Sequence, residues 1–469
     1  MLYHEHIDIN YKEEEVMGLR DSKSLTLKND KIDYLLSDEY EYKTWIKLEK
    51  IVAETQAELD LIPTEAAEAI NKEVKFDNFS VERYQYYLNE IGHGFYSFVE
   101  TVLEPTSEIT KKYFHYGITT QNIQQSSQML IIYEINKEFK KILLNAIKNL
   151  ANLALENKLG LMPGRTHSKH AVPTTFGYVV SSWIEELLPA FEMFLDSSEK
   201  LNEIMMGGAL GSYNSLGEEG QKLQIKVAEK LKVRPMNIPN RNIQLPKIQY
   251  ISSVVAVTNA IHKIAEAVYN NSVEELSEFT EYSDPSQIGS STMPHKVNPK
   301  ISKGIIANSM KLYDLMPSSL YANTKPYESN SSSYMVLNAN LNDTISFFTE
   351  VLIRFEELSE KIVFHPKKAY QNIIDNEGLD NSELVMMKIS EKLGKFDSHQ
   401  IIHDVAVEYQ MNKDQSYLDA LLKDKRIAEN FTRDEVTEWL NPENYYGLSD
   451  KLTEETYERV QKILEKYSI

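Results

Sequence analysis

One stretch near residue 290 combines side chains that could bind and act on a small anion. The sequence GSSTMPHKVNP at positions 289–299 brings together adjacent serines, a lysine and an asparagine. Lys296 and Asn298 are two positions apart, and together they can hold one carboxylate, the lysine by charge and the asparagine by hydrogen bonding. Pro294 and Pro299 restrict the backbone on either side of Lys296. Taken residue by residue, the same stretch is equally consistent with an ordinary surface loop.

As a string, residues 289–299 resemble the signature loop of the fumarase/aspartase superfamily, G-S-S-x-M-P-x-K-x-N-P, at every fixed position. The form SSTMPHKVNP is most similar to the adenylosuccinate lyase branch. Two further segments resemble the family in the right order, GRTHSKHAVPTTFG at 164–177 and FHYGITTQN at 114–122. LIPTEAA at 61–67, EIGH at 90–93 and GGALGSY at 207–213 are similar to parts of adenylosuccinate lyases, the first also to 3-carboxymuconate cycloisomerases. The resemblance runs from about residue 40 to 365.

This resemblance implies a lyase that splits a substituted succinate by β-elimination and releases fumarate. Such a reaction removes a proton beside a carboxylate, so it requires a base at the carbon and donors at the carboxylate. By the resemblance, Ser290 is the base, His167 is the acid that protonates the leaving nitrogen, and Lys296 and His93 complete the catalytic set. The residues expected to bind substrate are Asn298, Ser291, Thr119, Thr120, Thr166, His115 and Met293, with His93 and His115 on the leaving-group side. His170 and His295 are interpreted as ordinary polar residues.

Four positions depart from the family pattern. Lys303 stands where the family loop continues to a glutamate that supports the catalytic histidine, and Val336 stands where adenylosuccinate lyases carry a phosphate-binding arginine. An R-D pair before the helix near 250 is replaced by residues 244–247, and an aspartate by Asn122. An apolar valine cannot replace a phosphate clamp. These losses cluster on the leaving-group side, so we expect a retained reaction with an altered leaving group, smaller or less phosphorylated than AMP.

Three alternatives stay open. The chain could be a genuine adenylosuccinate lyase of purine biosynthesis with a rearranged phosphate site, or a cycloisomerase of the 3-carboxymuconate type. It could also be a catalytically silent helical scaffold, which Lys303 favours. The presence of Ser290, Lys296 and His167 argues against the scaffold.

Long helices must position these residues. Apolar side chains recur at three- and four-residue steps in 127–150 and 178–205, and segments 250–280 and 335–364 are each long enough for a helix of about 40 Å. Near the C-terminus, Thr432 is a candidate N-cap. The pattern predicts an all-α fold. The resemblance implies a three-domain subunit with a long central helical bundle, in a homotetramer whose active sites are shared between three subunits. We expect domains at 1–118, 119–365 (with a catalytic loop at 283–300) and 366–469.

Composition narrows the remaining possibilities. The 469 residues include no cysteine, which excludes disulfides and thiolate ligands, and the net charge of −20 disfavours nucleic-acid binding while allowing a small anionic substrate that contains a succinyl group. No apolar run approaches the roughly 20 residues that span a bilayer, and the acidic start does not resemble a signal peptide. We therefore expect a cytoplasmic enzyme with no membrane association. No cofactor or metal-site motif was found.

Overall fold

The computed structural model describes residues 27, 29–284, 289–324, 327–328, 331–412 and 414–467. Within these residues the chain forms twenty α-helices, three 3-10 helices and three two-stranded sheets. The expected all-α class is confirmed. The acidic first residues and positions 285–288 of the expected loop lie outside the described residues. No helix among the described residues is long and apolar enough to cross a membrane.

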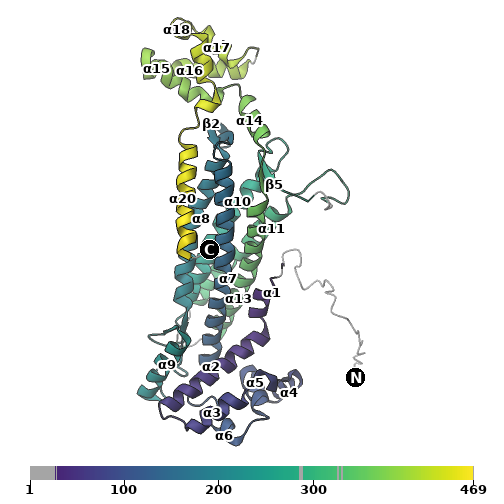
Figure 1. Ribbon diagram of the computed structural model, residues 1–469, viewed down its shortest axis with the longest axis vertical. Helices are drawn as coiled ribbons and strands as arrows, with labels where there is room; N and C mark the ends of the chain where they lie inside the picture. The colour runs from purple at the N-terminus through teal and green to yellow at the C-terminus, as the bar shows by residue number, and fades with distance from the viewer. Residues whose placement is uncertain are drawn as a thin grey trace.

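Six helices form the central bundle and run along the long axis of the molecule (Figure 1). Phe139, Phe194 and Phe348 meet at its centre, with ring centroids 5.0 and 5.8 Å from the Phe348 ring, and all three are fully buried. The apolar spacing of the sequence thus produces one continuous core. The bundle helices are α7 (Thr120–Glu156), α8 (Phe176–Leu201), α10 (Leu245–Asn271), α11 (Lys300–Tyr313), α13 (Ser331–Lys361) and α20 (Ser449–Tyr467).

Three of the expected helices end earlier than the pattern suggested, α8 at Leu201, α10 at Asn271 and α13 at Lys361. Helix α10 stops at Asn271, whose side-chain oxygen accepts hydrogen bonds from the backbone N–H groups of Glu278 and Phe279. Such a side-chain acceptor turns the chain away from the helix. The following residues form strand β5 (Phe279–Glu281), antiparallel to β6 (Ile362–Phe364), which directly follows α13.

One end of the bundle carries a helical layer built from the N-terminal segment (Figure 1). Its core contains Trp45, Phe95 and Phe98, whose rings pack at centroid distances of 5.0–6.3 Å. Helix α9 (Gly217–Leu231) also contributes to this core. The elements are α1 (Asp30–Leu35), α2 (Asp38–Glu58), α3 (Thr64–Glu73), η1 (Phe76–Asn78), α4 (Val81–Ile91), α5 (Gly94–Leu103) and α6 (Glu108–Tyr113).

The opposite end carries a second small helical cluster, and α20 then returns along the bundle (Figure 1). Thr432 caps α19, as predicted, in a reciprocal capping box with Glu435. The cluster comprises α14 (Pro366–Ile374), η2 (Leu379–Asn381), α15 (Ser382–Leu393), α16 (Lys395–Met411), α17 (Tyr417–Lys423), α18 (Lys425–Ala428), α19 (Arg433–Trp439) and η3 (Pro442–Asn444). The described residues thus form three hydrophobic clusters. The domain boundaries at 118 and 365 stay a prediction.

Two further small sheets complete the fold. Strands β1 (Leu161–Thr166) and β2 (Lys169–Thr175) form an antiparallel hairpin in which Thr166 pairs with Lys169. Strands β3 (Glu203–Ile204) and β4 (Arg234–Pro235) run parallel. The hairpin begins shortly after the end of α7, at the bundle end that faces the C-terminal cluster (Figure 1).

Candidate active site

His167 occupies the tip of the β1–β2 hairpin. His167 and Ser168 form its two-residue turn, with φ angles of 51° and 62°, the left-handed pair that a tight hairpin turn requires. Neither residue is a glycine, so the turn carries a conformational cost of about 1 kcal/mol per residue. Thr166 and His167 are both exposed. The hairpin therefore presents the imidazole to solvent on a rigid support, and Arg165 ties it to the buried Glu278.

The signature loop, residues 289–299, is folded back on itself. Ser290 Oγ accepts hydrogen bonds from the backbone N–H groups of Met293 (3.1 Å) and Thr292 (3.4 Å). Asn298 Nδ2 donates to the carbonyl of Gly289 over 2.9 Å. A Cβ at Gly289 would lie 2.3 Å from the Lys296 carbonyl oxygen, so this close crossing requires glycine. Ser291, Met293 and Lys296 are exposed on the resulting loop.

Glu281 fixes the end of this loop. Its buried carboxylate accepts from the backbone N–H groups of Ile301 (2.9 Å) and Ser302 (2.8 Å) and from Ser302 Oγ (2.6 Å). It therefore caps the N-terminus of α11 from the strand that precedes the loop. No sequence pattern marks Glu281 as a cap, because it lies twenty positions before the helix residue that it binds. Lys303 is exposed one residue further along α11.

The N-terminus of α7 holds a second group of expected site residues. Thr119 is its N-cap and forms a reciprocal capping box with Asn122. Asn122 Oδ1 accepts from the backbone N–H groups of Thr119 and Gly208, each over 3.2 Å, and so joins the helix to the glycine turn at 207–211. Both contacts need only an acceptor oxygen, which explains why an asparagine can stand where the family has an aspartate. Thr120 begins the helix and is half-buried.

Two histidines lie in the N-terminal layer. His93 caps α5, where its Nδ1 accepts from the backbone N–H of Tyr96 over 3.2 Å. His115 adopts a left-handed backbone with φ of 58° and packs against the Phe95 ring at a centroid distance of 5.3 Å. His115 Nδ1 lies 2.6 Å from Oε1 of Glu49. Burial disfavours charge on this ring, but the adjacent carboxylate outweighs it and raises the pKa of His115 above its usual value.

One chain does not bring all the expected residues together. Helix α7 has 37 residues and spans about 55 Å. Thr119 and Thr120 lie at its start, beside the N-terminal layer, whereas the hairpin with His167 follows its end (Figure 1). The signature loop leaves the bundle after β5 and returns into α11. His93, His115, Thr119 and Thr120 therefore gather at one end of the molecule and His167 lies at the other.

Two of the positions that depart from the family pattern, Val336 and residues 244–247, lie near the starts of α13 and α10. Val336 is exposed, and residues 329–330 of the expected phosphate-binding segment lie outside the described residues. Lys247 is buried, with its Nζ 5.6 Å from the centre of the Tyr334 ring and 3.4 Å from Oε1 of Gln128. Burial lowers the pKa of Lys247 to about 8. In the sequence, residues 244–247 stand only as the replacement of an R-D pair, and no local pattern predicts that Lys247 is buried.

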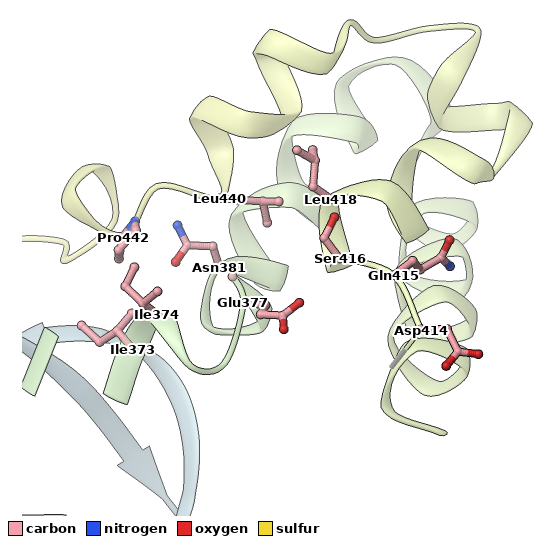
Figure 2. Close-up of a pocket in the computed structure, with 11 residues that line it drawn as sticks. Ile373, Ile374, Glu377, Asn381, Asp414, Gln415, Ser416, Leu418, Leu440 and Pro442 are labelled. Atoms are coloured by element: carbon pink, nitrogen blue, oxygen red, sulfur yellow. The ribbon is translucent and has the colours of Figure 1, made fainter. Parts of the chain in front are cut away.

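Two cavities lie toward the end of the bundle that carries the C-terminal cluster. Figure 2 shows a cavity of about 610 Å³ in the C-terminal cluster, whose labelled lining includes Glu377, Asn381 and Asp414 but none of the expected site residues. A cavity of about 510 Å³ lies between the hairpin, α8 and segment 445–452, with Thr166 in its lining. Among the described residues, no three His, Asp or Glu side chains gather as a metal site would require.

Comparison with known proteins identifies the family and supports the fold. A family model described as lyase matches residues 24–312, and one described as the adenylosuccinate lyase C-terminus matches residues 378–456. The chain is 28% identical to the adenylosuccinate lyase of Methanothermobacter thermautotrophicus, over 89% of this chain and 94% of that protein. It is 27% identical to the N-acetyl-S-(2-succino)cysteine lyase of Enterococcus italicus, over 89% and 92%. The crystal structure of a fumarate lyase from Mesorhizobium sp. BNC1 superposes with a TM-score of 0.85 at 22% identity, over 93% of this chain and 99% of that chain.

Proposed function

Because the chain belongs to the lyase family of the fumarase/aspartase superfamily, we propose that it cleaves the carbon–heteroatom bond of a substituted succinate and releases fumarate. The observation that carries this proposal is the signature loop. It keeps Ser290, Lys296 and Asn298 together, and the family match includes the segment that contains them.

The chemistry follows from what each group can do. Ser290 Oγ takes the proton from the carbon next to the succinyl carboxylate, whose growing charge Lys296 stabilises. The electron pair forms the new double bond while the carbon–heteroatom bond breaks, and His167 gives its proton to the leaving atom. A serine is a weak base, but the N–H groups of Thr292 and Met293 already point at its oxygen. Hydrogen bonds to the charged form favour an alkoxide.

The leaving group is the open part of the proposal. The relatives' names include a nitrogen-linked succinate, in adenylosuccinate, and a sulfur-linked one, in N-acetyl-S-(2-succino)cysteine. Val336 offers no clamp for a phosphate. We therefore propose an amine or thiol leaving group that is smaller or less phosphorylated than AMP.

Fumarate release tests the proposal directly. The protein is incubated with adenylosuccinate, with N-acetyl-S-(2-succino)cysteine and with a panel of N-succinyl amines, and fumarate is followed by ultraviolet absorbance. We expect turnover of one of the smaller substrates and little of adenylosuccinate. Efficient turnover of adenylosuccinate would instead support a genuine adenylosuccinate lyase, the alternative that the Methanothermobacter relative favours. The reverse reaction is followed as consumption of fumarate in the presence of the amines or thiols. If no substrate released fumarate and no fumarate was consumed in reverse, the proposed lyase activity would be refuted.

A shared site is the second part of the proposal. Thr120 begins α7, and His167 lies in the hairpin that follows the other end of this helix. A site that contains both residues therefore needs the hairpin of one copy of the chain and the start of α7 from another. We propose a homotetramer in which each site draws on three chains. Mixing inactive His167→Ala and His93→Ala proteins after partial dissociation should restore activity, because His167 and His93 lie at opposite ends of one chain and mixed assemblies contain some intact sites. Mixing two preparations of His167→Ala is the control. If the mixture stayed inactive although the subunits exchanged, the site would not be shared.

A further inference from the structure

Glu49 is a buried carboxylate that contacts the imidazole of His115. It lies on α2, its side chain is 1% exposed, and Oε1 lies 2.6 Å from Nδ1 of His115. An ionised carboxylate is costly to bury unless a cation or several donors compensate it. Within the described part of the chain, the contact found for Glu49 is the imidazole of His115. The pairing therefore favours the protonated ring.

The ring of His115 is held in one orientation. Its backbone is left-handed, Phe95 packs against one side, and Gln56 Nε2 donates to the carbonyl of the next residue, Tyr116, over 2.6 Å. Nδ1 is used by Glu49, which leaves the Nε2–H as the free donor of an imidazolium. The side chain is 21% exposed, so a ligand can reach it.

His93 has a different role in the same layer. Its Nδ1 accepts a hydrogen bond from the backbone N–H of Tyr96 over 3.2 Å and so caps the N-terminus of α5. Of these two histidines, His115 is the one whose Nδ1 faces a carboxylate.

We propose that Glu49 is a positioning residue: it holds His115 as an imidazolium whose Nε2–H binds an anionic group on the leaving portion of the substrate. This inference rests on the proposed function and on the family resemblance, which implies that His115 lies on the leaving-group side. With Val336 in place of the arginine, a histidine held against a buried carboxylate supplies the cation that selects an acidic leaving group over a neutral one.

The test uses Glu49→Gln, which retains size and a hydrogen-bond acceptor but removes the charge. Glu104→Gln is the matched control, because Glu104 forms an exposed ion pair with Arg83 in the same layer. The kinetic probes are N-acetyl-S-(2-succino)cysteine and its carboxamide, in which the carboxylate of the cysteine portion is neutral. In Glu49→Gln we expect KM for the acid to rise about tenfold or more and KM for the amide to change less than twofold. Equal effects on both probes, or none, would overturn the proposal.

A second measurement separates this inference from the proposed function. Nuclear magnetic resonance of protein with labelled histidine rings, with His115 assigned from a His115→Gln variant, gives its titration directly. Removal of the Glu49 charge should lower the pKa of His115 by about one unit or more. The control substitution Glu104→Gln should leave the pKa of His115 unchanged. An unshifted titration would overturn the role of Glu49 even if fumarate is released. If neither probe is turned over while the titration shifts as expected, the proposed substrates are wrong and the Glu49–His115 pair stands.

Discussion

Arg165 and Glu278 form a bidentate ion pair, with Nη1 of the arginine 2.7 Å from Oε2 of the glutamate and Nη2 2.5 Å from Oε1. Glu278 is fully buried, and Asn372 Nδ2 donates to its Oε1 over 2.8 Å. The pair joins the hairpin that presents His167 to the residue that precedes β5, from which the chain continues toward the signature loop. The supports of the proposed acid and of the proposed base thus share an anchor.

Removing this anchor should destabilise the protein. Arg165→Met leaves the Glu278 carboxylate buried without its cation, and such a loss costs about 3–5 kcal/mol. Urea unfolding at fixed protein concentration measures it. Arg459→Met is the matched control, because Arg459 pairs with Glu185 on the surface. This substitution should change the unfolding free energy by less than about 1 kcal/mol. Equal stability of the two variants would show that the buried pair is not an anchor.

Ser290→Ala and His167→Ala should each lower turnover by a factor on the order of 100 or more without altering the fold. Both side chains lie in loop or turn positions and neither belongs to the apolar core, so circular dichroism and thermal unfolding should stay close to the parent values. Ser182→Ala, an exposed serine of α8, is the control. Normal turnover by either loop or hairpin variant would show that its role is misassigned.

Lys303→Glu should restore the charge that the family places after the loop. If His167 donates its proton, activity falls as the pH rises through the pKa of that histidine. The resemblance implies that a carboxylate at this position supports the catalytic histidine by charge, so replacing the cation with a carboxylate should favour the imidazolium and raise this pKa. We therefore expect the alkaline limb of kcat/KM to move to higher pH. Lys311→Glu, at an exposed position of the same helix, should leave the limb in place. A large rise in KM with an unmoved limb would instead identify Lys303 as a substrate-binding cation.

Glu350 gives a prediction on stability. Burial raises its pKa to about 7, although Asn308 and Arg354 act in the opposite direction. The unfolded chain titrates near 4.5, so between these values the folded state holds more protons and unfolding free energy falls as the pH rises. Glu350→Gln should therefore be more stable than the parent at pH 8, on the order of 2 kcal/mol, with little gain at pH 4.5. Glu360→Gln, at an exposed position on the same helix, is the control. An equal gain at both pH values would contradict the shift.

The sequence predicted the fold well where local periodicity determines structure. The expected segments 127–150 and 178–205 fall largely on α7 and α8, because their apolar stripes bury against each other. The helix expected over 250–280 is shorter in the structure, because the side chain of Asn271 accepts backbone hydrogen bonds that end it. The resemblance predicted a set of site residues, but it did not predict the side chains that hold them in place. Glu49 and Glu281 act on residues 66 and about 20 positions away, and no local pattern marks such contacts.

The amide of Asn122 has one more consequence. A carboxylate at this joint would weaken as an acceptor once acid protonated it, whereas an amide oxygen accepts equally well at any ordinary acidity. The link between the first turn of α7 and the backbone of Gly208 therefore carries no ionisable group. In an acidic medium the framework at this end of the long helix should keep its hydrogen bonds while neighbouring carboxyl groups lose theirs.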